Sequence, residues 1–274
     1  MVVFPNAKIN IGLDIVRRRA DGYHDIVTAF MPVPWADILE IETAAGPDDV
    51  LTVTGRGVDC PPEKNLVMKA CRALRARVDF PAVDVRLTKI IPDGAGFGGG
   101  SADAAFTVTA INSLFNLGLD KATMAEVLAT VGSDCPFFVY NRPMLATGTG
   151  TTMSEVDIDL AGKHILLVKS ADSAVSTAQA YAGVTPHEPD VALADLLKLP
   201  IERWQGNIKN DFEVSVFAKA PAIARVKQQM AEMGAVYTAM SGSGACVFGI
   251  FNAPVSDQTI HLTFPNCDTF TSAL

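Results

Sequence analysis

The sequence lacks several features that would place it in large classes of protein. It has no basic excess of the kind that nucleic-acid-binding proteins use, because 22 Lys and Arg stand against 30 Asp and Glu and give a net charge of −8. Its five cysteines form no C-x-x-C pair, so neither a zinc site nor a disulfide framework is indicated. No apolar run is long enough to cross a membrane or to form the core of a signal peptide. We therefore expect a cytoplasmic protein with reduced thiols and with no nucleic-acid or membrane partner.

The chain is long enough to bury a sizeable core. It has 274 residues, of which 49% are apolar and 19% charged, and this length suits one large or two moderate domains. The sequence changes character near residues 148–153, after which a continuous apolar run at 164–168 resembles a buried strand. We predict two domains, at residues 1–150 and 151–274.

Periodicity predicts a mixture of strands and helices. Alternation of apolar and polar residues predicts strands at 8–15, 24–33 and 83–91, the first two forming a hairpin around a basic loop at 17–22. Helical spacing predicts helices at 65–78, 101–115, 121–131, 176–181, 191–199 and 220–233. Two apolar strands, at 235–240 and 245–251, flank a Ser-Gly-Ser-Gly turn that suggests a second hairpin.

A glycine-rich segment at residues 92–103 stands out. Five glycines fall within seven residues, from Gly94 to Gly100, between a predicted strand and a predicted helix. Such a density lets the backbone adopt positive φ and approach a ligand closely. The N–H groups of the loop and of the helix N-terminus then converge on an anion. We predict a phosphate-binding loop rather than a merely flexible one, with Ser101 placed to cap the helix or to meet a phosphate-bound metal.

Other glycine-rich loops give competing interpretations. Gly94, Gly96 and Gly99 satisfy G-x-G-x-x-G, the pattern of dinucleotide-binding folds. That fold needs a strand soon after the helix, whereas a second helix is predicted here. The Gly-Lys-Ser/Thr of a Walker loop and the H-R-D and D-F-G of protein kinases are absent. A nicotinamide-dependent oxidoreductase remains the alternative from another class, and tight NAD binding without ATP binding would favour it.

Three motifs resemble those of one family. The pattern P-x-G-A-G-F-G-G-G-S-A-D-A-A at 92–105 resembles the phosphate loop of the GHMP kinases, and A-K-I-N at 7–10 and S-G-S-G-A-C-V-F at 241–248 resemble that family's first and third motifs. Further blocks are similar to the branch that acts on a diphosphocytidyl sugar alcohol: 18–24 (R-R-A-D-G-Y-H), 132–138 (G-S-D-C-P-F-F), 175–177 (V-S-T) and 210–213 (N-D-F-E). The sequence departs from the loop pattern at Phe97 and Ala102, where leucine and serine are usual, and Asp93 adds a charge.

The resemblance implies a fold and an activity. The fold is α+β, with an N-terminal ATP-binding domain, a C-terminal ferredoxin-like domain and an active-site cleft between them. The activity is transfer of a phosphoryl group from ATP, with Mg²⁺, to the 2-hydroxyl of 4-diphosphocytidyl-2-C-methyl-D-erythritol, in the non-mevalonate route to isoprenoid precursors. The partner would be this small cytidine diphosphate substrate, and the enzyme a monomer or weak homodimer. A homoserine or mevalonate kinase of the same family remains open.

The resemblance also implies two catalytic residues. Asp134 would accept the hydroxyl proton as attack on the γ-phosphate begins. Lys8, on the polar face of the first predicted strand with Asn10, would hold the hydroxyl and Asp134 in register and counter the developing charge. Without the resemblance, Asp134 would be an ordinary helix cap before x-Pro, and Lys8 an exposed strand lysine.

The remaining site residues implied by the resemblance fall into two groups. The ATP group is Asn65, Pro92, Gly94, Ala95, Gly96, Phe97, Gly98, Gly99, Gly100 and Ser101, and Ser101 would also contact Mg²⁺. The cytidine group is Asn10, Tyr23, His24, Phe30, Thr177 and Tyr181, because aromatic faces stack on a base and histidine can hydrogen-bond its edge. Core packing is the alternative for each aromatic, above all Phe30, and a helix cap is the alternative for Asn65. The turn at 241–244 is expected to lie near the phosphate loop and support it.

Overall fold

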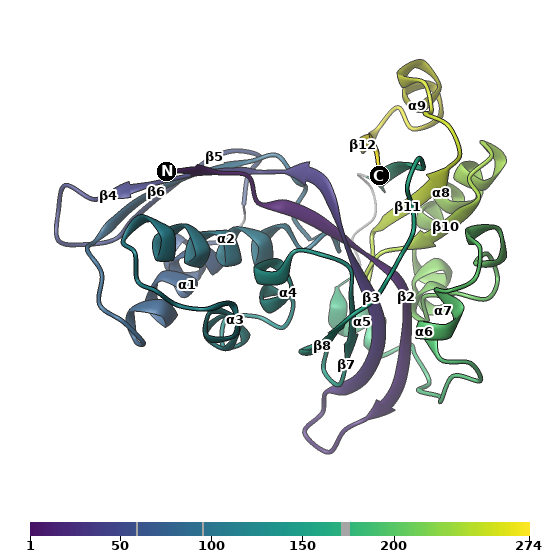
Figure 1. Ribbon diagram of the computed structural model, residues 1–274. Helices are drawn as coiled ribbons and strands as arrows, with labels where there is room; N and C mark the ends of the chain where they lie inside the picture. Colours follow the sequence, from purple (N-terminus) through teal and green to yellow (C-terminus); the bar gives the residue numbers. More distant parts are fainter. Residues whose placement is uncertain (59, 95, 171–175) are drawn as a thin grey trace. The chain divides into compact units, whose positions relative to one another are not determined.

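The computed structural model of the chain describes residues 1–58, 60–94, 96–170 and 176–274 (Figure 1). These residues form two compact units, each built from three stretches of chain. Unit 1 contains residues 1–8, 34–93 and 98–142, and unit 2 contains residues 9–33, 94–97 and 143–274. Both units combine helices with sheets, which confirms the predicted α+β class.

The last change of unit falls between Arg142 and Pro143, several residues before the boundary expected from sequence. Strand pairing explains why unit 2 also takes in residues from the N-terminal half. Strand β3 (His24–Ala36) pairs with β7 (Met144–Thr147), which in turn pairs with β8 (Thr152–Glu155). The hairpin strands therefore join a sheet that the C-terminal half completes.

Unit 1 contains a four-stranded sheet in the order β1-β4-β6-β5. The strands are β1 (Val2–Val3), β4 (Ile38–Thr43), β6 (Val83–Lys89) and β5 (Val50–Gly55). Alternate residues of β6 are buried, as its sequence pattern predicts. Strands β5 and β6 are parallel neighbours, and α1 (Leu66–Arg75) connects them as a β-α-β unit.

The helices of unit 1 include the one that follows the glycine-rich segment. They are η1 (Pro62–Lys64), α1, α2 (Gly99–Leu114), α3 (Lys121–Ala129) and α4 (Cys135–Tyr140), and α1 packs on α2. Side chains cap two of these helices. Asn65, for which a cap was the alternative to nucleotide contact, accepts a hydrogen bond from the Val67 N–H, and Asp120 accepts one from the Thr123 N–H. The expectation that Ser101 caps α2 is wrong, because the helix begins at Gly99 and Ser101 lies inside its first turn.

Unit 2 contains most of the β2–β3 hairpin. Strand β2 (Asn6–Arg18) begins in unit 1 and continues into unit 2, and β3 ends in unit 1. The sheet order β2-β3-β7-β8 confirms the predicted hairpin. The predicted basic loop is shorter than expected, because β2 extends to Arg18.

A second sheet of unit 2 has the order β10-β11-β9-β12, with all neighbours antiparallel. Its strands are β10 (Tyr237–Met240), β11 (Cys246–Phe251), β9 (His164–Ser170) and β12 (Cys267–Ala273), and the predicted β10–β11 hairpin is confirmed. The helices are α5 (Thr177–Tyr181), α6 (Leu193–Leu196), η2 (Ile201–Arg203), α7 (Phe212–Lys219), α8 (Pro221–Glu232) and α9 (Asp257–Thr263). Helix α6 is therefore much shorter than the helix predicted at 191–199.

Burial of apolar side chains explains how α8 packs in unit 2. Ile223, Val226 and Met230 recur on one face of α8 and are buried in a cluster with Val168 and Val247 of the sheet. None of the helices in the described part of the chain combines the length and apolar character that a bilayer crossing requires.

Candidate functional site

The glycine-rich segment has the backbone that the sequence predicts. Gly94, Gly96 and Gly98 have φ angles of 63°, 81° and 72°, in the left-handed region that favours glycine. At Gly96 a side chain would also collide with the backbone carbonyl of Ser241. Ala95, which the sequence also assigns to this loop, lies outside the described residues.

The segment ends in the first turn of α2. The first intrahelical hydrogen bond runs from the Ala102 N–H to the Gly98 carbonyl at 2.8 Å. The N–H groups of Gly99, Gly100 and Ser101 therefore have no acceptor within the helix. Together with the helix dipole of this 16-residue helix, they make its N-terminus suited to a phosphate group.

Lys8 and Asp134 form an ion pair in unit 1. The Lys8 Nζ lies 3.2 Å from Asp134 Oδ2, and the Lys8 side chain is only 3% exposed while that of Asp134 is 34% exposed. Lys8 is therefore not the exposed strand lysine that its position alone would suggest. Asp134 precedes α4 but its side chain makes no capping hydrogen bond, so the alternative of an ordinary cap is wrong.

The ion pair lies against the end of the glycine-rich segment. A Cβ on Gly98 would come within 3.1 Å of the Lys8 side chain and 3.0 Å of the Phe138 ring. The absence of a side chain at Gly98 thus lets the Lys8 stem pack on the backbone that begins α2. A buried ammonium and an accessible carboxylate consequently stand next to a helix terminus suited to an anion, an arrangement that can deprotonate a hydroxyl and stabilise negative charge.

The neighbouring thiol is not a nucleophile. Burial raises the pKa of Cys135 to about 11, an effect that the Asp134 charge reinforces and a hydrogen bond with Ser101 partly offsets. A thiol with this pKa is almost wholly protonated near pH 7 and is unreactive. Its contact with Ser101 places that serine beside the residue that follows Asp134.

A cavity of about 290 Å³ opens beside Asn65. Its walls are strand β5, residues 56–58, Cys60 and Pro62. Asn65 is 9% exposed and caps α1, so the structure confirms the cap while its contact with a nucleotide stays a prediction. The volume lies near the lower end of the range for small-molecule sites.

An aromatic cluster in unit 2 contains two of the residues predicted to bind cytidine. The rings of His24 and Tyr181 are stacked, with centroids 4.8 Å apart and an interplanar angle of 25°. Tyr181 also meets the Phe212 ring edge-on at 4.8 Å. Burial and then the charge of Arg18 lower the pKa of His24, so its imidazole is neutral near pH 7 and can both donate and accept hydrogen bonds.

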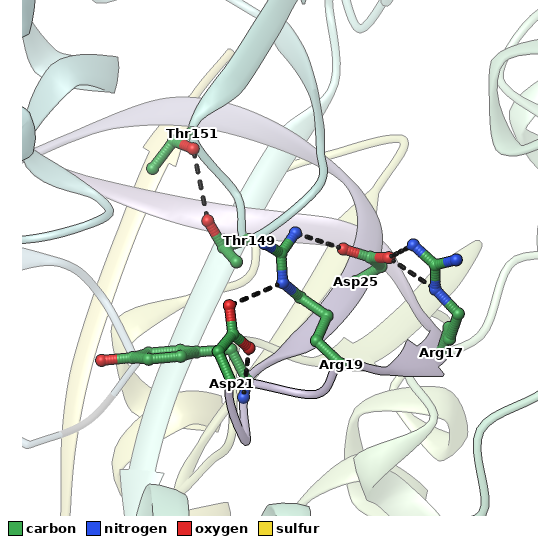
Figure 2. A network of polar contacts seen from close by, with 7 residues as sticks. Arg17, Arg19, Asp21, Asp25, Thr149 and Thr151 are labelled. Carbon is green, nitrogen blue, oxygen red and sulfur yellow. Dashed lines mark hydrogen bonds and ion pairs between the residues drawn. The ribbon is translucent and has the colours of Figure 1, made fainter.

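Two arginines and two aspartates form a network of ion pairs at the turn of the β2–β3 hairpin (Figure 2). Asp25 accepts hydrogen bonds from Arg17 and from Arg19, and Arg19 also donates to Asp21 at 3.0 Å. The hydrogen bonds from Arg17 and then Arg19 lower the pKa of Asp25. Asp21 in turn accepts from the Tyr23 N–H at 3.0 Å. Tyr23 itself is 68% exposed, so its ring is available to a ligand.

Three other predicted substrate residues are less accessible or already engaged. Phe30 is 2% exposed, which agrees with the core-packing alternative, and Asn10 is 3% exposed and donates to Thr28 Oγ1 at 2.9 Å. The hydroxyl of Thr177 lies 3.0 Å from that of Ser243. The contact of each residue with a substrate stays a prediction.

The turn at 241–244 lies beside the glycine-rich segment, as expected. The Ser241 hydroxyl donates to the Gly96 carbonyl at 3.2 Å and accepts from the Asn10 N–H at 3.1 Å. The Asn210 amide donates to the carbonyls of Met240 and Gly242, both at 2.8 Å, which fixes the turn itself. Asn210 belongs to the N-D-F-E block, and sequence alone gave no reason to assign it this role.

A buried ion cluster in unit 1 has no signature in the sequence. Lys89 donates to Asp37 and to Asp103, and all three side chains are at most 4% exposed. Asp103 belongs to the glycine-rich motif, but neither Lys89 nor Asp37 follows a motif that would reveal the cluster. Their distance apart in sequence, 52 residues, hides the pairing.

A glycine-rich loop at a helix N-terminus, with a lysine–aspartate pair beside it, suits a class of enzyme, the kinases that phosphorylate small-molecule alcohols. Family models agree with this class. The model described as GHMP kinases N terminal domain matches residues 65–142, and GHMP kinases C terminal matches residues 192–261.

Two curated relatives are named 4-diphosphocytidyl-2-C-methyl-D-erythritol kinase. The one from Parabacteroides distasonis is 48% identical over 93% of each chain, and the one from Porphyromonas gingivalis 45% over 92% of each. The chain therefore belongs to the GHMP kinase family.

Solved structures share the fold. A crystal structure of 4-(cytidine 5'-diphospho)-2C-methyl-D-erythritol kinase matches with a TM-score of 0.82 and 28% identity, over 99% of this chain and 98% of the other. Homoserine kinase from Cytophaga hutchinsonii matches with a TM-score of 0.69 at 16% identity, over 97% and 93% of the two chains. The second likeness concerns the fold alone, and the predicted two-domain GHMP kinase architecture is confirmed.

Proposed function

We propose that this chain transfers the γ-phosphoryl group of ATP to the 2-hydroxyl of 4-diphosphocytidyl-2-C-methyl-D-erythritol, giving the 2-phosphate and ADP. The observation that carries the proposal is the Lys8–Asp134 pair, 3.2 Å apart, packed against Gly98 at the N-terminus of α2. The names of the relatives supply the substrate, and the G-Y-H and D-C-P-F-F blocks of the sequence agree with it. The enzyme would act in the cytoplasm as a monomer or weak homodimer.

The triphosphate of ATP would lie on the backbone from Gly94 to Ser101. The positive φ angles of this segment and the N–H groups of the first turn of α2 support that placement. The cavity beside Asn65, within unit 1, is of a size that suits the base.

A magnesium ion would be held mainly by the phosphate oxygens. Among the described residues, no group of three or more His, Cys, Asp or Glu side chains is placed to bind a metal. Such a site fits Mg²⁺, because in kinases this ion usually keeps several waters and takes only one or two protein ligands besides the phosphates. Ser101, in the first turn of α2, is the hydroxyl that we propose as such a ligand. When bound, the ion neutralises charge across the β and γ oxygens.

Asp134 would accept the proton of the 2-hydroxyl as its oxygen attacks phosphorus. Its side chain is 34% exposed, so a substrate hydroxyl can reach the carboxylate. Lys8 orients the carboxylate through the ion pair and offers positive charge to the developing transition state. Burial of the Lys8 side chain restricts its motion, which makes it a fixed partner.

The cytidine end of the substrate would contact the hairpin residues Tyr23 and His24 and the stacked ring of Tyr181. The exposed ring of Tyr23 and the neutral imidazole of His24 support stacking and edge recognition of a base. Asn10, Phe30 and Thr177 complete the proposed set.

A substrate panel tests the proposal. Purified protein is mixed with ATP and Mg²⁺ and, in parallel, with the diphosphocytidyl substrate, homoserine or mevalonate, and ADP release is measured. We expect ADP release only with the diphosphocytidyl substrate. Turnover of homoserine or mevalonate in its place would refute the assigned substrate. Tight binding of NAD with no binding of ATP would refute the kinase assignment altogether.

A further inference from the structure

The buried cluster of Asp37, Lys89 and Asp103 touches both ends of the glycine-rich segment. Asp37 Oδ1 accepts hydrogen bonds from the N–H groups of Ile90 and Ile91, the two residues before Pro92. Its other oxygen, Oδ2, accepts from Lys89 Nζ at 2.5 Å. The start of the segment is therefore held by a carboxylate that has no exposed surface.

The same ammonium holds the other end. Lys89 Nζ donates to Asp103 Oδ2 at 2.8 Å, and Asp103 lies in the second turn of α2. A Cβ on Gly99 would come within 3.3 Å of Lys89 Nζ, so the ammonium sits directly behind the first turn of that helix. One buried lysine thus connects the residues before the loop with the helix after it.

The cluster adds little positive charge to the loop. Two carboxylates face one ammonium, and burial raises the pKa of Asp103 to about 7 although Lys89 lowers it. Burial by itself would lower the pKa of Lys89, but the two carboxylates outweigh that effect and keep the ammonium charged. Asp103 Oδ1 is buried and, among the described residues, has no hydrogen-bond partner. The cluster is therefore suited to hold backbone in place rather than to attract phosphate.

We propose that Asp37, Lys89 and Asp103 form a loop clamp, a set of positioning residues that fix the two ends of the phosphate-binding segment and thereby set the affinity for the triphosphate of ATP. The proposal rests on the proposed function, because it assumes that ATP binds this segment. A clamp works because the loop amides must already point at the phosphates before binding, which avoids the entropic cost of ordering them.

The chain offers a matched control for the clamp. Asp49 bridges a cation and a backbone amide in the same way, since its Oδ1 accepts from Arg75 at 2.7 Å and from the Val83 N–H at 3.0 Å. Val83 and Lys89 are opposite ends of strand β6, so Asp49 stabilises the same strand away from the loop. Asp37→Asn and Asp49→Asn therefore make the same chemical change at two ends of one strand.

The first experiment measures the Kd for MgATP by calorimetry without acceptor, and the KM for each substrate, in both variants. We expect Asp37→Asn to raise the Kd and KM for ATP at least tenfold, with the KM for the diphosphocytidyl substrate within twofold of wild type. Asp49→Asn should leave both KM values within twofold of wild type, even if its midpoint of urea unfolding falls as far as that of Asp37→Asn. An unchanged Kd in Asp37→Asn, or an equal rise in Asp49→Asn, would overturn the clamp. Wild-type protein that binds no ATP would instead refute the proposed function.

A second pair of variants separates geometry from charge and does not depend on Asp37→Asn folding. Asp103→Asn keeps an oxygen that accepts from Lys89, whereas Asp103→Leu does not, and both remove the negative charge. We expect the Kd for MgATP to stay within threefold of wild type in Asp103→Asn and to rise at least tenfold in Asp103→Leu. Equal values in the two variants would show that the oxygen that accepts from Lys89 does not set the affinity for ATP, and would overturn the proposal.

Discussion

Replacing Asp134 by asparagine removes the proposed base while keeping the shape of the side chain. Loss of a general base typically lowers turnover by about 10²–10⁴-fold, equivalent to about 3–5 kcal/mol of transition-state stabilisation. ATP should still bind normally, because the loop amides and α2 are untouched. The variant also removes the negative charge that Asp134 places 3.2 Å from the buried ammonium of Lys8. Since a third of the Asp134 side chain is exposed, we reduce the usual cost of breaking a buried ion pair to about 1 kcal/mol of unfolding free energy.

The assay couples ADP release to NADH oxidation at saturating ATP and substrate, with ATP affinity measured separately by calorimetry. The control is Asp79→Asn, the same change at an exposed carboxylate of unit 1, which should keep wild-type kcat. A kcat for Asp134→Asn within fivefold of wild type would refute the role of Asp134 as base. A large loss of ATP affinity in this variant would refute the view that the pair acts mainly in the transition state.

Three further predictions test other parts of the structure. Gly100→Ala should leave the unfolding free energy unchanged or raise it by up to about 1 kcal/mol, because its Cβ meets only Leu66 at 3.5 Å. The KM for ATP should rise at least fivefold, because glycine lets the backbone approach a ligand closely. A melting curve and an ATP titration measure the two quantities. His24→Ala should raise the KM for the diphosphocytidyl substrate about 3–10-fold through the lost stack, with the KM for ATP unchanged, and an equal change in both values would contradict it. Burial raises the pKa of Asp14 to about 6, so its protonated form favours the folded state and wild-type stability falls as pH rises from about 4 to 6. Asp14→Asn should therefore match wild type below pH 4 and exceed it by about 1–2 kcal/mol above pH 7, after allowance for partial exposure, in urea melts across that range.

Much of the fold and of the loop followed from local sequence patterns. Glycines at 94, 96 and 98 carry the positive φ angles that their density predicts, and Asn65 caps α1, which is the alternative that its position offers. The hairpins were visible because alternation and turn residues are local signals. Helix α2 starts two residues before its predicted start, because glycines at 99 and 100 have low helix propensity and yet form its first turn.

The parts that sequence could not supply depend on contacts between distant residues. Nothing near Lys8 indicates that it is buried, since its partner lies more than a hundred residues later, and the family resemblance alone suggested the pairing. Asp37 and Lys89 lack any motif. Phe30 shows the converse difficulty, a residue that the sequence assigned to the substrate and that is buried in the structure. An aromatic side chain in an alternating strand gives the same sequence pattern whether it faces a ligand or the core.

The interleaving of the two units constrains how this enzyme can be divided. Each unit draws on three separated stretches of the chain, so no single cut releases either one whole. A gene fragment ending at residue 142 would retain β3 but lose β7, its partner on that side of the sheet. Truncated halves should consequently fail as independent modules, and the kinase is expected to be inherited, recombined and engineered only as a complete polypeptide.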